Sequence, residues 1–250
     1  MNILGEEIYR CYDQYGPIRL FKNGPLRYLT FGLEAEQSCI NMDAPHTLMH
    51  QYTQGMILAL LFQPKPKRVT LLGLGAGCLV HALHGYDAGI DLVAVELREK
   101  VVTVAQQWFG LESVPNLVIY TEDAVEYMTN EQTQSDFIFA DIYNDDGMME
   151  AQLSDEFMSN CFRNLSENGV LVMNLWDQGG GSHPQASQAI SDHFQNQCIS
   201  CEIDEGNLIA YAFKGGVPEI NRRRLLPLAK GLGKKLNIPA VKLLNRLKQR

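Results

Sequence analysis

The stretch "VTLLGLGAGCLVHALHG", from Val69 to Gly85, decides the fold. It joins an apolar run, three glycines that alternate with other residues, and a segment with helical spacing. This order is typical of the first strand and loop of an open α/β sheet that binds a nucleotide. Glycine adopts positive φ angles and lets a ligand approach the backbone closely. We therefore expect Gly73, Gly75 and Gly77 to contact a bound nucleotide or nucleoside.

The pattern of the first strand and helix continues along the chain. Apolar runs predict strands at residues 68–74, 91–97, 116–123, 136–143, 169–176, 198–203 and 207–213. Helical spacing predicts helices around 78–84, 99–109, 124–129, 155–165 and 184–195. Continuous apolar strands separated by helices indicate a sheet covered on both faces. The sequence thus predicts a doubly wound, mostly parallel, seven-stranded sheet whose last two strands form an antiparallel edge hairpin.

The first part of the chain has a different pattern. "GPIRLFKNGPLRYLTFG", residues 16–32, alternates apolar and polar residues around turn signals, which predicts a small antiparallel sheet. "HTLMHQYTQGMILALLF", residues 46–62, has helical spacing and ends before the prolines of "QPKPK". We expect a small N-terminal β-domain over 1–46, a Rossmann-like nucleoside-binding domain over 47–220 and a basic helical tail over 221–250.

Composition favours a soluble globular protein, with 46% hydrophobic and 20% charged residues. Apolar runs stay well below the roughly 18 residues of a membrane helix, and the N-terminus lacks the order of a signal peptide. We expect a cytoplasmic protein that does not span a membrane. The six cysteines are scattered, and "CISC" at Cys198–Cys201 is a lone pair. Two ordinary thiols are the simpler interpretation, with zinc or redox chemistry as the alternative, and we predict no metal.

The net charge of -8 hides an asymmetry between the tail and the rest of the chain. Residues 221–250 hold ten Lys and Arg and no Asp or Glu, so this segment is +10 and the remainder is -18. A basic tail can bind nucleic acid or anionic lipid. The alternative is a helix in "AVKLLNRLKQR" that docks on the acidic body through Val241, Leu243, Leu244 and Leu247. We favour the docked helix and expect no nucleic acid partner.

Acidic residues follow the glycine loop at successive strand ends. Glu96 lies nineteen residues after Gly77, the distance at which a carboxylate can accept hydrogen bonds from ribose hydroxyls. Asp123, followed by Ala124, ends the third strand and could hold the exocyclic amine of an adenine. Asp141 ends the fourth strand at the same rim. Each acid could instead be a helix cap. Their common position predicts a nucleoside ligand.

The rival NAD-binding pattern has a third glycine after two intervening residues, whereas "AGC" follows Gly75 here. The spacing Gly-x-Gly-x-Gly is similar to the first motif of class I S-adenosylmethionine-dependent transferases. Together with the N-terminal β-domain, "PKPKRVTLLGLGAG", "VAVEL", "TEDAVEYM" and "FADIY" resemble the spermidine synthase family over roughly residues 25–215.

This resemblance implies a homodimer that transfers an aminopropyl group from decarboxylated S-adenosylmethionine to a small-molecule amine. It also implies that Gln37 and the glycine loop hold the nucleoside, with Glu96 on the ribose and Asp123 and Ala124 at the adenine. Asp141 matches the family's acid that accepts a proton from the amine. Tyr52 lies in the stretch that matches the family's tyrosine-histidine-glutamate motif, and Tyr143 could line the pocket or simply pack.

The sequence departs from the family at its anchors for cationic groups. Ala76 stands where the family has an aspartate for the aminopropyl ammonium, and Asn144 stands where a second carboxylate would bind the acceptor. "HQYTQ" keeps Tyr52 but has no carboxylate. Each lost charge-assisted hydrogen bond is worth roughly 1.5 to 3 kcal/mol, so two would weaken polyamine binding about a hundredfold or more. We therefore expect an altered substrate.

Two other functions stay open. A methyltransferase that uses intact S-adenosylmethionine is suggested by Ala76, because the lost aspartate would oppose the methionine carboxylate. A non-catalytic nucleoside-binding protein could use its basic tail to contact a partner. In "WDQGGGSHP", Trp176, Asp177 and a hinge at Gly179–Gly181 could form a lid over the acceptor, or simply a surface loop.

Overall fold

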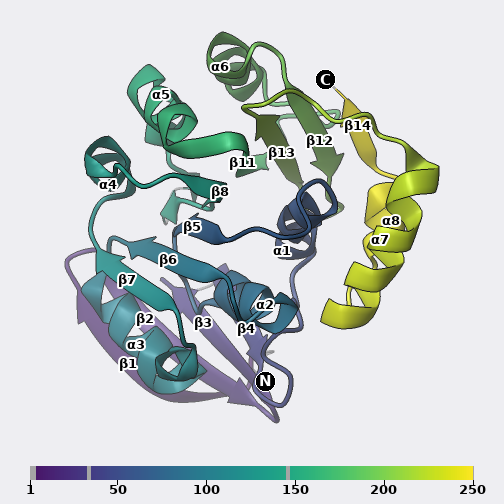
Figure 1. Ribbon diagram of the computed structural model, residues 1–250. Helices are drawn as coiled ribbons and strands as arrows, with labels where there is room; N and C mark the ends of the chain where they lie inside the picture. The colour runs from purple at the N-terminus through teal and green to yellow at the C-terminus, as the bar shows by residue number, and fades with distance from the viewer. Residues whose placement is uncertain (1–3, 33–34, 145–146, 250) are drawn as a thin grey trace.

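The computed structural model describes residues 4–32, 35–144 and 147–249. Two sheets dominate it, and Figure 1 shows the N-terminal sheet lying beneath one end of the larger sheet. The mostly parallel α/β architecture and the small N-terminal antiparallel sheet are both confirmed.

The N-terminal sheet is a four-stranded antiparallel meander in the order β1-β2-β3-β4. Its strands are β1 (Glu6–Asp13), β2 (Gly16–Asn23), β3 (Leu26–Phe31) and β4 (Ala35–Asn41). Two-residue turns join the first three strands, as the turn signals predict. Ile18, Leu20 and Leu29 are fully buried and share a core with helices of the main domain. The small sheet therefore packs against the α/β part of the chain.

The main sheet has the order β14-β12-β13-β11-β8-β5-β6-β7. Its strands are β5 (Arg68–Leu72), β6 (Asp91–Glu96), β7 (Leu117–Thr121), β8 (Ser135–Ala140), β11 (Leu165–Trp176), β12 (Cys198–Glu202), β13 (Asn207–Phe213) and β14 (Leu247–Gln249). The chain runs outward from β5 to β7 and then returns to place β8 beside β5, in parallel. Strand order thus reverses between β5 and β8, where open α/β sheets bind ligands.

Helices cover both faces of this sheet (Figure 1). One face packs against α1 (Gln51–Met56), the 3-10 helix η1 (Ile57–Leu61), α2 (Cys78–Tyr86), α3 (Glu99–Phe109), α7 (Arg222–Leu236) and α8 (Ala240–Leu244). The other packs against α4 (Ala124–Asn130), α5 (Asp155–Asn164) and α6 (Pro184–Phe194). Short elements complete the chain: η2 (Leu111–Ser113), β9 (Tyr143–Asn144), β10 (Gly147–Met148) and η3 (Glu150–Leu153). Within the described ranges, no helix is both long and apolar enough to cross a membrane.

The structure corrects three sequence-based expectations. The helix predicted from residue 46 begins only at Gln51, and its second half is the 3-10 helix η1. The sheet contains an eighth strand, β14, which the C-terminal segment contributes. The predicted docking helix stops at Leu244, and Leu247 is buried in β14 instead. The tail does dock on the body, through Leu243, Leu244 and Leu247. The domain boundaries at 46 and 220 remain predictions.

Candidate active site

A cavity of about 630 Å³ lies at the carboxyl ends of the parallel strands. Its floor comes from the glycine loop after β5 and from the ends of β6 and β8. Tyr15 and Phe31 from the N-terminal region also line it, as do Trp176 at the end of β11 and Asn207 at the start of β13. A cavity of this size is in the range that holds cofactors and small substrates.

The glycine loop has the positive φ angles that its sequence predicts: 93° at Gly73, 55° at Gly75 and 85° at Gly77. A Cβ atom on Gly73 would collide with the main-chain oxygen of Asp141, and one on Gly75 would lie 2.6 Å from Ser38 Oγ. The glycines are therefore required by close packing within the protein as well as by backbone conformation.

The three loop glycines do not have the same position relative to the cavity. Gly73 and Gly75 are among the described residues that line it, whereas Gly77 is not. Gly77 instead forms the N-cap of α2 and packs against the side chain of Leu111. Ala76 is fully buried behind the loop, and its amide donates to Ser38 Oγ at 3.2 Å.

Glu96 ends β6 and lines the cavity. Its Oε2 accepts the amide of Leu74 at 3.1 Å, and its Oε1 accepts the amide of Arg98 at 3.0 Å. Burial raises the pKa of Glu96 above its usual value, although these backbone hydrogen bonds act in the opposite direction. A carboxylate has about four acceptor sites, so Glu96 can hold the loop and still accept hydroxyl groups of a ligand.

Asp123 is a helix cap and also lines the cavity, so its predicted contact with adenine stays a prediction. It is the N-cap of α4, with Oδ1 accepting the amides of Val125 at 2.8 Å and Glu126 at 3.2 Å. Asp123 and Ala124 also line the cavity. Both capping bonds use the same oxygen, so Oδ2 is the atom available to a ligand.

Asp141 follows β8, lines the cavity and belongs to a partly buried hydrogen-bond chain of three side chains. Its Oδ1 accepts Asn174 Nδ2 at 2.8 Å, and Asn174 Oδ1 accepts Asn207 Nδ2 at 3.0 Å. Burial raises the pKa of Asp141, and the neighbouring side chains of Asn174 and Tyr52 only partly offset this.

Both predicted tyrosines, Tyr52 and Tyr143, lie close to the hydrogen-bond chain of Asp141, Asn174 and Asn207. Burial, followed by the charge of Asp141, raises the pKa of Tyr52 well above its usual value. The Tyr52 ring stacks on His50 with centroids 5.7 Å apart. Tyr143 lines the cavity and its hydroxyl donates to the main-chain oxygen of Asn174 at 3.2 Å. Asp141, Tyr52 and Tyr143 are therefore brought together.

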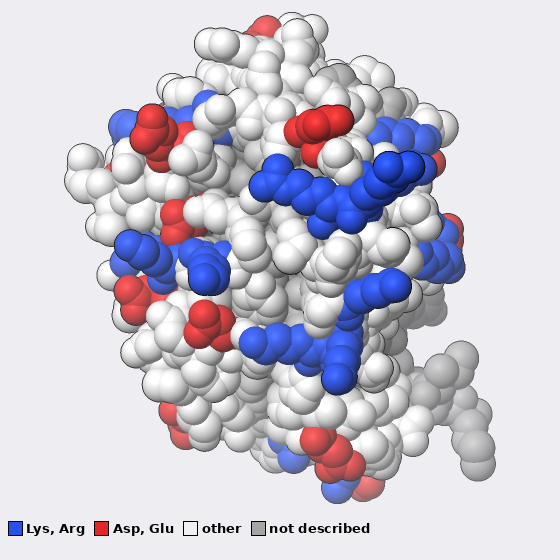
Figure 2. Space-filling view, turned by 45° about the vertical axis from the view of Figure 1, so that its right-hand side comes forward, with Lys and Arg blue, Asp and Glu red and all other residues white. Residues whose placement is uncertain are grey.

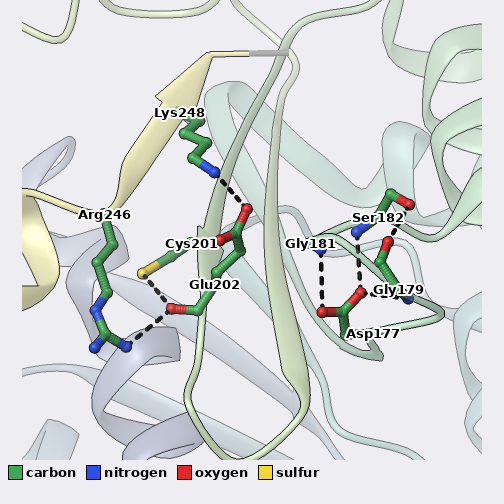
Figure 3. Close-up of polar contacts among 8 residues, drawn as sticks. All are labelled: Asp177, Gly179, Gly181, Ser182, Cys201, Glu202, Arg246 and Lys248. Carbon is green, nitrogen blue, oxygen red and sulfur yellow. Dashed lines mark hydrogen bonds and ion pairs between the residues drawn. The ribbon is translucent and has the colours of Figure 1, made fainter.

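Gln37 and Asn144 lie in β4 and β9, and their side chains fall outside the described part of the structure. The loop after Trp176 is held by Asp177, whose carboxylate accepts the amides of Gly179, Gly181 and Ser182 at 2.8 to 3.1 Å (Figure 3). These bonds give the glycine stretch a defined conformation, as in an ordered surface loop. Trp176 lines the cavity with 56% of its surface exposed.

Arg98, which was not predicted from the sequence, lines the cavity and binds Asp13 at the end of β1. Its guanidinium donates to both Asp13 oxygens at 2.8 and 2.9 Å and lies 4.5 Å from the ring centroid of Phe31. Burial acts to raise the pKa of Asp13, but hydrogen bonds, chiefly from Arg98, outweigh it and lower the pKa. An arginine just after an acidic strand end gave no signal, because its partner is 85 residues away.

Asn174 and Asn207 were also missed. An amide inside an otherwise apolar strand could have identified Asn174, because a buried polar side chain needs a partner. Asn207 opens β13 and resembles an ordinary turn residue. In the described ranges no cluster of three or more His, Cys, Asp or Glu side chains could hold a metal ion, and Cys198 and Cys201 are both buried on β12.

The chain is similar to known proteins in both sequence and structure. The model of the spermine/spermidine synthase domain matches residues 49–203. A polyamine aminopropyltransferase of Chromobacterium violaceum is 26% identical over 234 residues, covering 93% of this chain and 89% of the relative. One of Vibrio vulnificus is 27% identical over 247 residues, covering 95% and 81%.

Solved structures give the same fold. A probable spermidine synthase from Corynebacterium glutamicum superimposes with a TM-score of 0.76 at 18% identity, over 93% of this chain and 86% of that one. Human methyltransferase-like protein 13 in complex with SAH gives a TM-score of 0.60 at 20% identity, over 76% and 90%. At these identities the structural likeness concerns the fold alone.

Proposed function

The chain belongs to the spermine/spermidine synthase family and is a transferase, and we propose that it moves an aminopropyl group from decarboxylated S-adenosylmethionine to an amine. The charge of the cavity carries this proposal. Five carboxylate residues line it: Glu96, Glu122, Asp123, Asp141 and Glu205. Among the described lining residues, Arg98 is the only Lys or Arg, and it is engaged by Asp13.

Such a lining favours ligands that carry positive charge and no carboxylate. Decarboxylated S-adenosylmethionine has a sulfonium and an ammonium, and an amine acceptor adds another cation. Intact S-adenosylmethionine also carries a carboxylate, for which the described lining offers no uncommitted Lys or Arg. This argument favours aminopropyl transfer over methyl transfer, although Ala76 removes one acid from the loop.

The nucleoside occupies the end of the cavity formed by the glycine loop, Glu96 and Asp123. Glu96 accepts the ribose hydroxyls, and Asp123 accepts the adenine amine through Oδ2. Gln37 holds the nucleoside from the N-terminal sheet, and Ala124 borders the adenine. Gly73 and Gly75 let the donor approach the backbone, while Gly77 shapes the loop from behind.

Transfer is a displacement at the carbon of the aminopropyl group that is bonded to sulfur. The amine nitrogen forms a bond to this carbon, the carbon–sulfur bond breaks, and its electron pair remains on sulfur to give neutral methylthioadenosine. Asp141 accepts the proton that the amine loses. Burial makes its carboxylate a stronger base than an exposed aspartate, and Tyr52 and Asn174 hold it in place. Tyr143 and Trp176 border the acceptor.

The test is calorimetric titration with decarboxylated S-adenosylmethionine, intact S-adenosylmethionine and methylthioadenosine. We expect tighter binding of the decarboxylated donor, followed by release of methylthioadenosine when diamines and longer polyamines are added. Asp123→Ala should weaken all three ligands, and Glu126→Ala, an exposed change on the same helix, should weaken none. Preference for the intact donor would instead identify a methyltransferase. Donor binding without turnover over a broad amine panel would favour a nucleoside-binding protein.

The identity of the acceptor follows from the same panel. Ala76 and Asn144 lead us to propose a substrate other than the family's usual polyamine. A homodimer in the cytoplasm is also part of the proposal. Light scattering of the purified protein tests the dimer, which a monomeric mass would exclude.

A further inference from the structure

The basic C-terminal segment is built into the main sheet rather than appended to it. Strand β14 pairs antiparallel with β12, placing Leu247 opposite Cys201. Figure 2 shows that Lys and Arg side chains gather on the face that α7 and α8 form, with acidic side chains beside them. Part of this basic charge is directed at the acidic hairpin between β12 and β13.

Arg246 makes the central contacts of this arrangement. One guanidinium nitrogen donates to the main-chain oxygen of Glu202 at 3.3 Å, and another donates to Asp204 Oδ2 at 2.8 Å. Lys242 lies 3.8 Å from the same Asp204 oxygen. Lys248 pairs with the carboxylate of Glu202, as Figure 3 shows together with the bond from Arg246 to the Glu202 carbonyl. Three basic side chains thus hold one hairpin.

The hairpin turn that they hold reaches the cavity. The turn is closed by the Ile203 amide on the Asn207 oxygen at 2.9 Å, and it places Glu205 and Asn207 in the cavity wall. The amide of Asp177 donates to the Gly206 oxygen at 2.9 Å, which links the turn to the loop after Trp176. The turn therefore contributes directly to the cavity wall and is also tied to the loop that follows Trp176, another lining residue.

A continuous path leads from this turn to the reacting group. Asn207 donates to Asn174, and Asn174 donates to Asp141. A shift of the turn moves Asn207 first, because strand β13 begins there. Bond lengths near 3 Å leave little room for such a shift before the hydrogen bond to Asn174 is lost.

We propose that Arg246 is a positioning residue for the transfer reaction: by fixing the 203–207 turn through Glu202 and Asp204, it keeps Asn207, and through it Asn174 and Asp141, in register with the acceptor. Arg246 is not among the described residues that line the cavity, so it acts through other residues. This inference rests on the proposed function only for its kinetic readout. The geometric part concerns the turn alone and has its own test.

The kinetic test compares Arg246→Gln with Arg223→Gln, a matched change at an exposed position of the same basic segment. We expect Arg246→Gln to lower kcat for the amine roughly tenfold, since displacing reacting groups by a fraction of an ångström is costly. Its affinity for decarboxylated S-adenosylmethionine should stay within twofold of the wild type. Arg246→Lys should recover part of kcat, and Arg223→Gln should behave as wild type. Equal kcat in Arg246→Gln and wild type would overturn the proposal.

The structural test is amide hydrogen exchange, which needs no turnover. In Arg246→Gln, and in Asp204→Asn, the amides of 203–207 and 174–178 should exchange at least fivefold faster, with no change in Arg223→Gln. Asp204 is an exposed partner, so its variant keeps the fold if Arg246→Gln does not. Unchanged exchange in both variants would refute the proposal that Arg246 fixes the 203–207 turn. If the wild type turns over no amine, the proposed function is wrong. The exchange result still tests whether Arg246 fixes the 203–207 turn.

Discussion

Replacing Asn174 with alanine tests the hydrogen-bond chain on which the proposed chemistry depends. Asn174 is 3% exposed, and its amide bridges Asp141 and Asn207 with bonds of 2.8 and 3.0 Å. Asn174→Ala removes a donor to a buried carboxylate, which is worth roughly 1.5 to 3 kcal/mol. If the same free energy is lost in the transition state, kcat falls about 10- to 150-fold.

The same change has a signed effect on pH dependence. The hydrogen bond from Asn174 favours the ionised form of Asp141, so its loss raises the pKa of Asp141 further. A base with a raised pKa becomes active only at higher pH, and the acid limb of the rate profile should move upward.

The assay is methylthioadenosine release at saturating donor, measured across pH for wild type, Asn174→Ala and Asn168→Ala. Asn168 lies on the same strand in an exposed position, so its variant controls for loss of an asparagine from β11. A loss near 2 kcal/mol should also lower Tm by roughly 4 to 8 °C. A folded Asn174→Ala enzyme with unchanged kcat and an unmoved acid limb would refute the support that Asn174 gives to Asp141.

Three further changes have defined outcomes. Asp141→Asn should reduce kcat at least a hundredfold. It should also raise Tm at neutral pH, because the folded-state pKa of Asp141 is raised and its ionisation therefore removes stability from the wild type as pH rises above 3.8. Calorimetry across pH measures this change, and an unchanged Tm at neutral pH would contradict it. Gly73→Ala should lower the free energy of unfolding in urea by roughly 3 to 5 kcal/mol, because the strain of a positive φ angle and a clash with the backbone add. Gly110→Ala has the same strain without the clash and should cost about 1 to 2 kcal/mol. Equal losses in the two variants would contradict the contribution of the clash. Arg98→Met should destabilise the protein by roughly 2 to 4 kcal/mol. Because the ion pair lowers the pKa of Asp13, its contribution to stability is present above pH 3.8 and is lost as pH falls through the folded-state pKa. A wild type that stays more stable than the variant in strong acid would argue against the ion pair.

The elements of the α/β domain follow from local patterns in the sequence. Helix α3 runs over the same residues that its spacing predicts, and α2, α4, α5 and α6 differ by one or two residues at their ends. Apolar periodicity is sufficient here because each helix buries one face on the sheet. The start of α1 and the nature of β14 were not predictable in this way. Leu247 is apolar at both helical and strand spacing, and only the free edge of β12 decides between them.

The residues of the site also fall into those that the local sequence predicts and those that only tertiary packing brings together. The sequence by itself determined the glycine loop, Glu96, Asp123 and Asp141, because parallel strands of one sheet end at the same edge and carry whatever follows them to one place. Tertiary structure alone decided that Ala76 and Gly77 lie behind the loop, that Asn207 and Asn174 support Asp141, and that Arg98 and Arg246 lock distant segments to the cavity. These contacts join residues 33 to 85 positions apart. Hydrogen bonds between such residues depend on how strands and loops pack in space, and packing leaves no periodic trace in the local sequence.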